Sequence, residues 1–161
     1  MKETFRDLLR IKQKLSMEEC IRLLKTEKRG VLSVNGFNGY PYGMPMNHWY
    51  HDADGVLYFH CGKKGHRLDA LQHSDRVSFC VVDQGNAMPG EWALNFKSVI
   101  VFGRMKLVDD PEQIAFVSEQ LSRKFTDDEQ YIQNEIRRFA SQTLLLVLTP
   151  EYICGKAVRE S

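Results

Sequence analysis

The strongest constraint on the fold is the close spacing of β-type segments separated by turn residues. The run VLSV (31–34) ends in the turn sequence NGFNG (35–39), and DADG (52–55) separates an aromatic-rich run over 40–50 from the next apolar run. Connections this short join antiparallel neighbours, because a parallel pair needs a crossover of a dozen residues or more. The other predicted strands are 56–61, 76–82, 96–108 and a long strand from 143 that precedes an irregular end.

The run from Tyr40 to Tyr50 has an unusual composition for a strand. It contains Pro41 and Pro45, and each proline removes a hydrogen-bond donor from the ladder. The pattern predicts one strand that lies at an edge of the sheet or is bulged.

Four helical segments interrupt the β pattern. Two begin at sequences of the capping-box form S/T-x-x-E, and one begins with an aspartate followed by proline in the first turn. The predicted helices run from Ser16 to about Gly30, over 67–73, from Asp110 past Leu121, and from Thr126 to about Arg138. This is not the regular alternation of a doubly wound sheet, so the sequence predicts a mainly β protein, a small barrel with accessory α-helices. Its length of 161 residues fits a single domain over 1–161.

Charge and cysteine content exclude several classes of function. The formal net charge is +1, which gives no overall electrostatic basis for binding nucleic acid or an acidic membrane. The four cysteines are far apart and form no C-x-x-C pair, which indicates reduced thiols rather than a zinc site. No signal peptide and no long apolar run is present. We therefore expect a cytoplasmic protein with no nucleic-acid or membrane partner.

One local exception to this neutral composition is the segment FHCGKKGHRLDAL (59–71). Glycines and bases lie where a strand ends and helical spacing begins. Glycine lets backbone amides approach a ligand, and a helix start adds unpaired amides and the positive end of the helix dipole. The segment matches neither a P-loop nor a dinucleotide fingerprint. It predicts a phosphate site, with a solvated charged loop as the alternative.

The order of these segments resembles a known family. The series RGVLSV, GYPYGMPMNHWY, GVLYFHCGKKGHRLDAL and RVSFCVV, followed by FKSVIVFGRMKLVDD and LTPEYICGKA, is similar to the pyridoxamine-phosphate-oxidase-like split barrels, especially their nitroimidazole-resistance branch. The similarity covers about residues 18–157. It implies a six-stranded antiparallel split barrel of the FMN-binding type, a homodimer, and FMN in the groove between the subunits.

The resemblance also implies which residues contact the cofactor. His60 and Cys61 lie at the ribityl-phosphate end of the third strand, Lys64, Gly65, His66 and Arg67 lie at the phosphate, and Ser98 lies beside the ring. The second strand runs alongside the isoalloxazine with Met44, Pro45, Met46, Asn47, His48 and Trp49. Family oxidases have basic residues at both ends of this strand, where this chain has Met44 and Trp49. Phosphate binding is therefore expected to depend on the 62–67 loop, and the case for pyridoxal-forming oxidase activity is weakened.

Each candidate has a structural alternative. Arg67 suits bidentate phosphate contact but could be a surface arginine. His60 could contact flavin or substrate, or be a core histidine. The Asn47 amide could contact the pyrimidine edge of the flavin or belong to a β-bulge. For the remaining candidates the alternative is a place in the hydrophobic core. They are the aromatic residues Trp49, Trp92 and Phe96 and the thiols Cys61 and Cys80.

No metal site is predicted. The histidines 48, 51 and 60 have no carboxylate or thiolate at a recognisable ligand spacing.

The function predicted from the sequence is an FMN-dependent reductase of small electrophilic compounds such as nitroaromatics. Hydride would come from N5 of the reduced flavin, and His60 or a nearby aromatic residue would position the small-molecule acceptor. The alternatives are a flavin- or haem-binding carrier or sensor, and a deazaflavin-dependent reductase.

Overall fold

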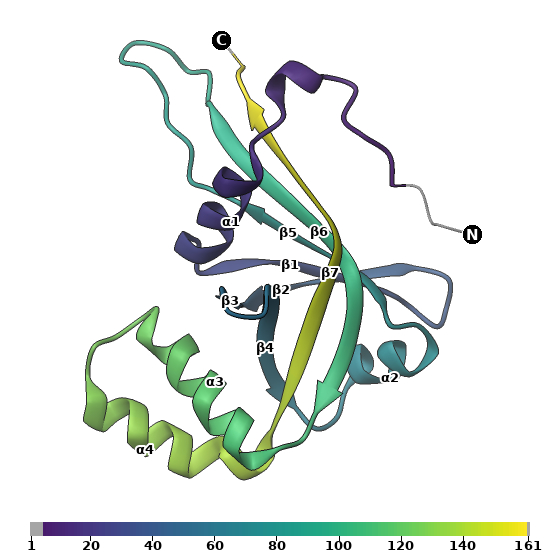
Figure 1. Cartoon of the computed structure of the whole chain (residues 1–161), viewed down its shortest axis with the longest axis vertical. Helices are drawn as coiled ribbons and strands as arrows, with labels where there is room; N and C mark the ends of the chain where they lie inside the picture. The colour runs from purple at the N-terminus through teal and green to yellow at the C-terminus, as the bar shows by residue number, and fades with distance from the viewer. Residues whose placement is uncertain (1–4, 161) are drawn as a thin grey trace.

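The computed structural model describes residues 5–160 and contains one curled, seven-stranded antiparallel sheet (Figure 1). Its strand order is β2-β1-β5-β6-β7-β4-β3, and every pair is antiparallel. The strands are β1 (Arg29–Asn35), β2 (Pro41–Asn47), β3 (Trp49–His51), β4 (Val56–Gly62), β5 (Arg76–Val82), β6 (Phe96–Val108) and β7 (Thr143–Val158). The predicted mainly β split-barrel class is confirmed.

The sheet has seven strands rather than the six expected. The predicted strand over 40–50 is two strands, β2 and β3, separated by His48. These two strands form opposite edges of the sheet, since β2 pairs with β1 and β3 pairs with β4. A single residue therefore joins the two edges, and the sheet must curl to bring them together. Local composition could not reveal this division, because it depends on the partner strands, β1 for β2 and β4 for β3.

One face of the curled sheet forms the main core. Alternate residues of each strand point inward, as the period of two requires. The fully buried members include Leu32 of β1, Phe59 of β4 and Phe79 of β5, and the rings of Phe59 and Phe79 meet edge to face with centroids 4.9 Å apart. The alternate residues of the same strands therefore point outward, away from this core.

β6 and β7 are long strands at the middle of the sheet. They pair with each other, β6 also pairs with β5, and β7 also pairs with β4. The register of their ladder shifts between Phe102 and Gly103. A side chain at Gly103 would collide with the carbonyl oxygen of Thr149, so the close approach of the two strands here requires glycine. β7 continues as a strand to Val158, so the prediction of an irregular end was wrong. The cause is that pairing along β6 keeps this segment extended.

Three of the four α-helices begin at side-chain caps. The structure has α1 (Met17–Thr26), α2 (His66–His73), α3 (Pro111–Arg123) and α4 (Glu129–Phe139), with 3-10 turns η1 (Ile11–Gln13) and η2 (Ala140–Gln142). The capping box at Ser16 and the Asp110 cap are confirmed. α4 is capped by Asp128, which accepts from the Tyr131 amide, and not by Thr126 as predicted. α1 ends at Thr26 and not near Gly30, because β1 already pairs with β2 from Arg29.

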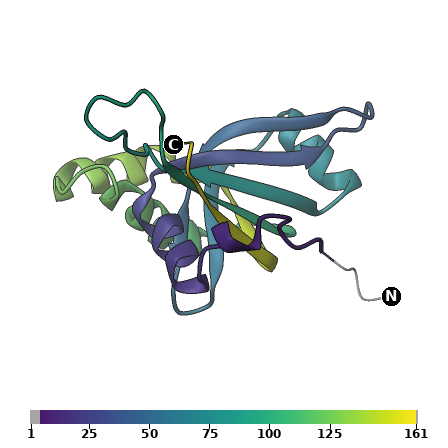
Figure 2. The same cartoon turned by 90° about the horizontal axis from the view of Figure 1, so that it is seen from above.

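The helices lie at the margins of the sheet. In both views α2 lies on one side of the molecule and the α3–α4 hairpin on the other (Figures 1 and 2). α3 packs through Ile114, Val117 and Leu121 on a second apolar cluster that includes Leu145 of β7. No helix within residues 5–160 is long and apolar enough to cross a membrane.

Candidate functional site

A groove of about 350 Å³ opens where β1 begins and β2 ends. It is lined by Arg29, Pro45, Met46, Asn47 and His60. Arg29 and Asn47 are direct partners in the β1–β2 ladder, and Nε of Arg29 donates to Oδ1 of Asn47 over 2.9 Å. This bond orients the Asn47 amide and places a guanidinium at the mouth of the groove.

His60 faces this groove because of the strand pleat. Leu57 and Phe59 of β4 are buried in the core, so His60, the residue after Phe59, points away from it. The desolvation of the imidazole lowers the pKa of His60 below its usual value. The ring is therefore neutral at pH 7, able to donate one hydrogen bond and accept one, and carries no fixed charge.

The start of α2, next along the chain from β4, presents free backbone amides. Gly65 is the N-cap and has φ +136°, a conformation that favours glycine. No side chain caps this helix, in contrast to α1, α3 and α4. The amides of the first turn are thus available to an anion, at the positive end of the helix dipole.

Arg67 lies in this first turn and connects the loop to β2. Its Nε donates to Sδ of Met44 over 3.0 Å, and the side chain is half-buried. Burial raises the pKa of the Cys61 thiol, and the nearby Arg67 charge partly offsets this. The guanidinium is thus held beside Met44 of β2 and Cys61 of β4.

Comparisons with known proteins show the family of the chain. The family model described as pyridoxamine 5'-phosphate oxidase matches residues 16–157, most of the chain. The chain belongs to this family. Among curated proteins, no sequence matches.

Solved structures support the split-barrel fold of this family member. A candidate 5-nitroimidazole antibiotic resistance protein from Bacteroides thetaiotaomicron is 18% identical, with a TM-score of 0.74 over 89% of this chain and 86% of that one. A conserved hypothetical protein from Mycobacterium tuberculosis is 19% identical, with a TM-score of 0.75 over 93% and 90%. A FAD-binding protein from Mesorhizobium loti is 22% identical, with a TM-score of 0.64 over 91% and 97%.

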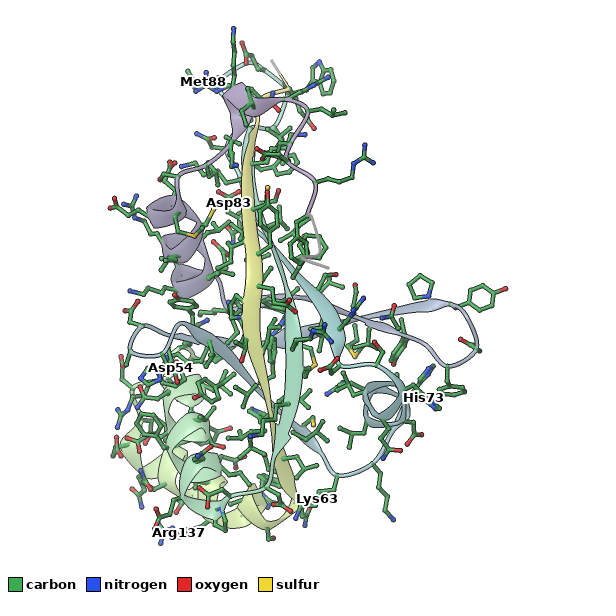
Figure 3. The ribbon with its side chains drawn as sticks, turned by 45° about the vertical axis from the view of Figure 1, so that its right-hand side comes forward. Asp54, Lys63, His73, Asp83, Met88 and Arg137 are labelled. Carbon is green, nitrogen blue, oxygen red and sulfur yellow. The ribbon has the colours of Figure 1, made fainter. Side chains whose placement is uncertain are left out.

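The other bases of the 62–67 loop have different environments in this split barrel. The His66 ring stacks on Tyr42 with centroids 4.2 Å apart, so the ring is held by β2 while the backbone amide stays at the helix start. Lys63 lies 3.6 Å from Asp109, at the end of the sheet that also carries the α3–α4 hairpin (Figure 3). Lys64 is exposed. Arg67 therefore has the most fixed position among the four bases.

Three of the expected contact residues are buried. Met44 and Met46 are 6% and 7% exposed, and only Met46 also borders the groove. His48 is completely buried, with Nε2 2.7 Å from the Leu24 carbonyl oxygen and its ring edge-on to Phe79. In this conformation His48 has no surface to offer a cofactor. His48 lies at the break between β2 and β3.

Trp49 and Ser98 are not among the residues that line the groove. Trp49 stacks on His51 with centroids 4.6 Å apart and meets Phe116 of α3 edge-on. Ser98 pairs with Lys156 near the end of β7, whereas His60 pairs with Leu145 near its beginning.

Arg29 is the residue that sequence reasoning missed. It precedes the first predicted strand and shows no motif of its own. Its role follows from the ladder, which places it opposite Asn47, and the signal that could have found it is a base at a strand start. Within residues 5–160, no three His, Cys, Asp or Glu side chains gather closely enough to hold a metal ion.

Proposed function

We propose that this split barrel binds FMN and uses it to reduce small electrophilic compounds such as nitroaromatics. The observation that carries the proposal is that β2 and β4 each connect the groove with the start of α2. Asn47 and His60 line the groove, and Met44 and Cys61 on the same two strands lie beside Arg67. Both ends of this path lie along β2, since Met44 contacts Arg67 and Asn47 lines the groove. The three residue steps between them span roughly 10 Å at about 3.3 Å per residue.

The donors along this path suit a flavin mononucleotide. The free amides of α2 and the guanidinium of Arg67 would hold the phosphate dianion, since charge-assisted bonds to phosphate are the strong ones. The Asn47 amide, fixed by Arg29, would donate to and accept from the polar edge of the ring. Pro45 would lie along the ring as an apolar support.

The bound flavin would supply a hydride, two electrons with one proton, to the acceptor, and solvent would supply any further proton. His60 would orient the acceptor by a hydrogen bond from its neutral ring. A neutral donor suits this role, because it does not leave a buried charge uncompensated when the site is closed from water.

The outward face of the sheet supports a homodimer. A row of residues crosses five adjacent strands in register and ends at the groove: Pro45, Val31, Cys80, Ile100 and Cys154. Val31 and Ile100 are 45% and 38% exposed, a large apolar exposure for the middle of a sheet. A second copy packed on this row would border the groove and could bring its own Ser98 to the ring.

Ile100→Arg is expected to weaken self-association by at least about 10-fold, because it would bury a charge without a partner at the centre of this face. Flavin occupancy should fall in parallel. Light scattering over a dilution series measures the effect, and Leu107→Arg, at a similarly exposed position farther along β6, serves as the control. A wild-type protein that is monomeric with flavin bound would refute the dimer.

The test of the proposed function is the reoxidation of the reduced protein by a nitroaromatic acceptor. The purified protein should show an oxidised-flavin spectrum, and chromatography of the released cofactor should identify FMN. A Soret band, or release of FAD or a deazaflavin, would contradict the proposal. After anaerobic reduction, the acceptor should reoxidise the protein faster than it reoxidises free reduced FMN.

His60→Ala should retain FMN and slow this reoxidation by about 10- to 100-fold, as expected for the loss of one positioned hydrogen-bonding group. The matched control is His73→Ala, on the exposed end of α2. Equal rates for wild type and His60→Ala would make His60 structural. A wild-type rate no faster than that of free FMN would leave a flavin carrier or sensor as the function.

A further inference from the structure

A second pocket adjoins His60. It has a volume of about 190 Å³ and lies between the α3–α4 hairpin, η2 and the beginning of β7. His60 lines both this pocket and the groove. A molecule held here would therefore contact the same imidazole that lines the proposed flavin site.

α3 and α4 line this pocket with polar, acidic and apolar side chains. Tyr131, Glu135 and Phe139 follow one another at four-residue spacing on α4, and Ser118 and Ser122 do the same on α3, so each set forms one helix face. Ile132, on another face of α4, is completely buried and anchors the helix.

Glu135 gives the pocket its charge. Among the lining residues within 5–160, it is the one that carries a formal charge at pH 7, because His60 is neutral there. Glu135 is half-buried. Its carboxylate forms no ion pair and no side-chain hydrogen bond with the described part of the chain. A partly desolvated carboxylate without a partner favours a cationic group or a strong hydrogen-bond donor.

The pocket volume is suited to a single ring. A cavity of about 150 Å³ lined by apolar side chains is known to take benzene. A pocket of about 190 Å³ therefore has room for a single aromatic ring with small substituents. Phe139 and Ile136 supply apolar contacts for such a ring, and Glu135 lies one helical turn from Phe139.

We infer that this pocket binds single-ring aromatic compounds with a cationic or hydrogen-bond-donating substituent, and that Glu135 selects them over anionic ones. This inference deepens the proposed function, since it names the class of acceptor that His60 would contact. It concerns binding and does not itself require a flavin reaction.

The experiment measures binding with unreactive probes, benzylamine and benzoate, by calorimetry on the purified protein with its native cofactor content. Benzylamine should bind at least about 5-fold more tightly than benzoate, as one partly exposed ion pair allows. Glu135→Gln should remove this preference. Glu112→Gln, which neutralises an exposed carboxylate on α3 outside the pocket, should keep it. Equal affinities for the two probes, or a preference that survives Glu135→Gln, would overturn the inference.

A second measurement separates this inference from the proposed function. The reduced protein is offered 4-nitrobenzylamine and 4-nitrobenzoate as acceptors. Reduction of both with equal Michaelis constants would keep the reductase function and overturn the selection by Glu135. Selective binding of benzylamine without reduction of either nitro compound would keep the pocket and overturn the reductase function.

Discussion

Arg67→Ala is expected to weaken FMN binding by about 10- to 150-fold, equivalent to roughly 1.5–3 kcal/mol for one charged hydrogen-bond donor. The effect should be large because the Met44 contact already fixes the side chain, so little further rotamer entropy is lost on binding. The same variant should bind riboflavin as the wild type does, because riboflavin lacks the phosphate. Calorimetric titration of both ligands into wild type and variant gives the four affinities needed.

Two controls show whether the loss comes from the phosphate contact. Lys64→Ala removes a charge of the same sign from the exposed part of the loop and should cost less, since a mobile lysine acts as a point charge. An unchanged melting temperature of Arg67→Ala without ligand would show that α2 remains folded. If wild type binds FMN and riboflavin equally, the proposed phosphate site at α2 is wrong.

The second large effect concerns acid stability, and it originates at His48. Burial lowers the pKa of His48 from 6.5 to about 3, and the charge of Lys124 adds to the shift, against a smaller opposing effect of the Leu24 carbonyl. Since the carbonyl can only accept, Nε2 carries the proton. Nδ1 is then a buried acceptor without a partner within residues 5–160. Protonation of Nδ1 would bury an unpaired charge.

The sign of the pH effect follows from this lowered pKa. As pH falls below 6.5, the unfolded chain takes up a proton at His48 while the folded chain does not, so acid favours unfolding. The stability present above pH 6.5 is lost progressively towards pH 3, by about 2 kcal/mol at pH 5 and about 3 kcal/mol at pH 4. Desolvation lowers the pKa of His60 in the same direction and adds to the slope.

Urea unfolding at pH 7, 6 and 5 measures this slope. His48→Asn is expected to be less stable at pH 7 but to show a clearly flatter dependence on pH. His73→Asn, at an exposed position on α2, should keep the wild-type slope. A wild-type slope that persists in His48→Asn would assign the acid sensitivity to other groups.

The sequence by itself predicted the elements whose signals are local. β5 and β6 have the predicted bounds, Arg76–Val82 and Phe96–Val108, because each is an apolar β-type run between turn residues or caps. The caps at Ser16 and Asp110 were likewise readable, since a cap and the amide that it accepts from lie within three residues. The loop before α2 was found for the same reason, because its glycines, bases and helix start are consecutive.

Only the tertiary structure decided which of these elements meet. The division of the run 40–50 at His48 depends on pairing with β1 at one edge and β4 at the other, and neither partner is encoded within the run. Arg29 joins the groove because the ladder sets it opposite Asn47, eighteen positions away in the chain.

The same holds for the surroundings of His60, which the local pattern left open between a core residue and a functional one. The pleat of β4 points the His60 side chain away from the core. The α3–α4 hairpin, distant in the chain, forms with His60 a second pocket that includes Glu135. Periodicity and capping act over a few residues, and so they are visible in one sequence. Register and sheet closure depend on contacts between distant segments, whose free energies compete with one another, and so they are settled only when the whole chain is packed.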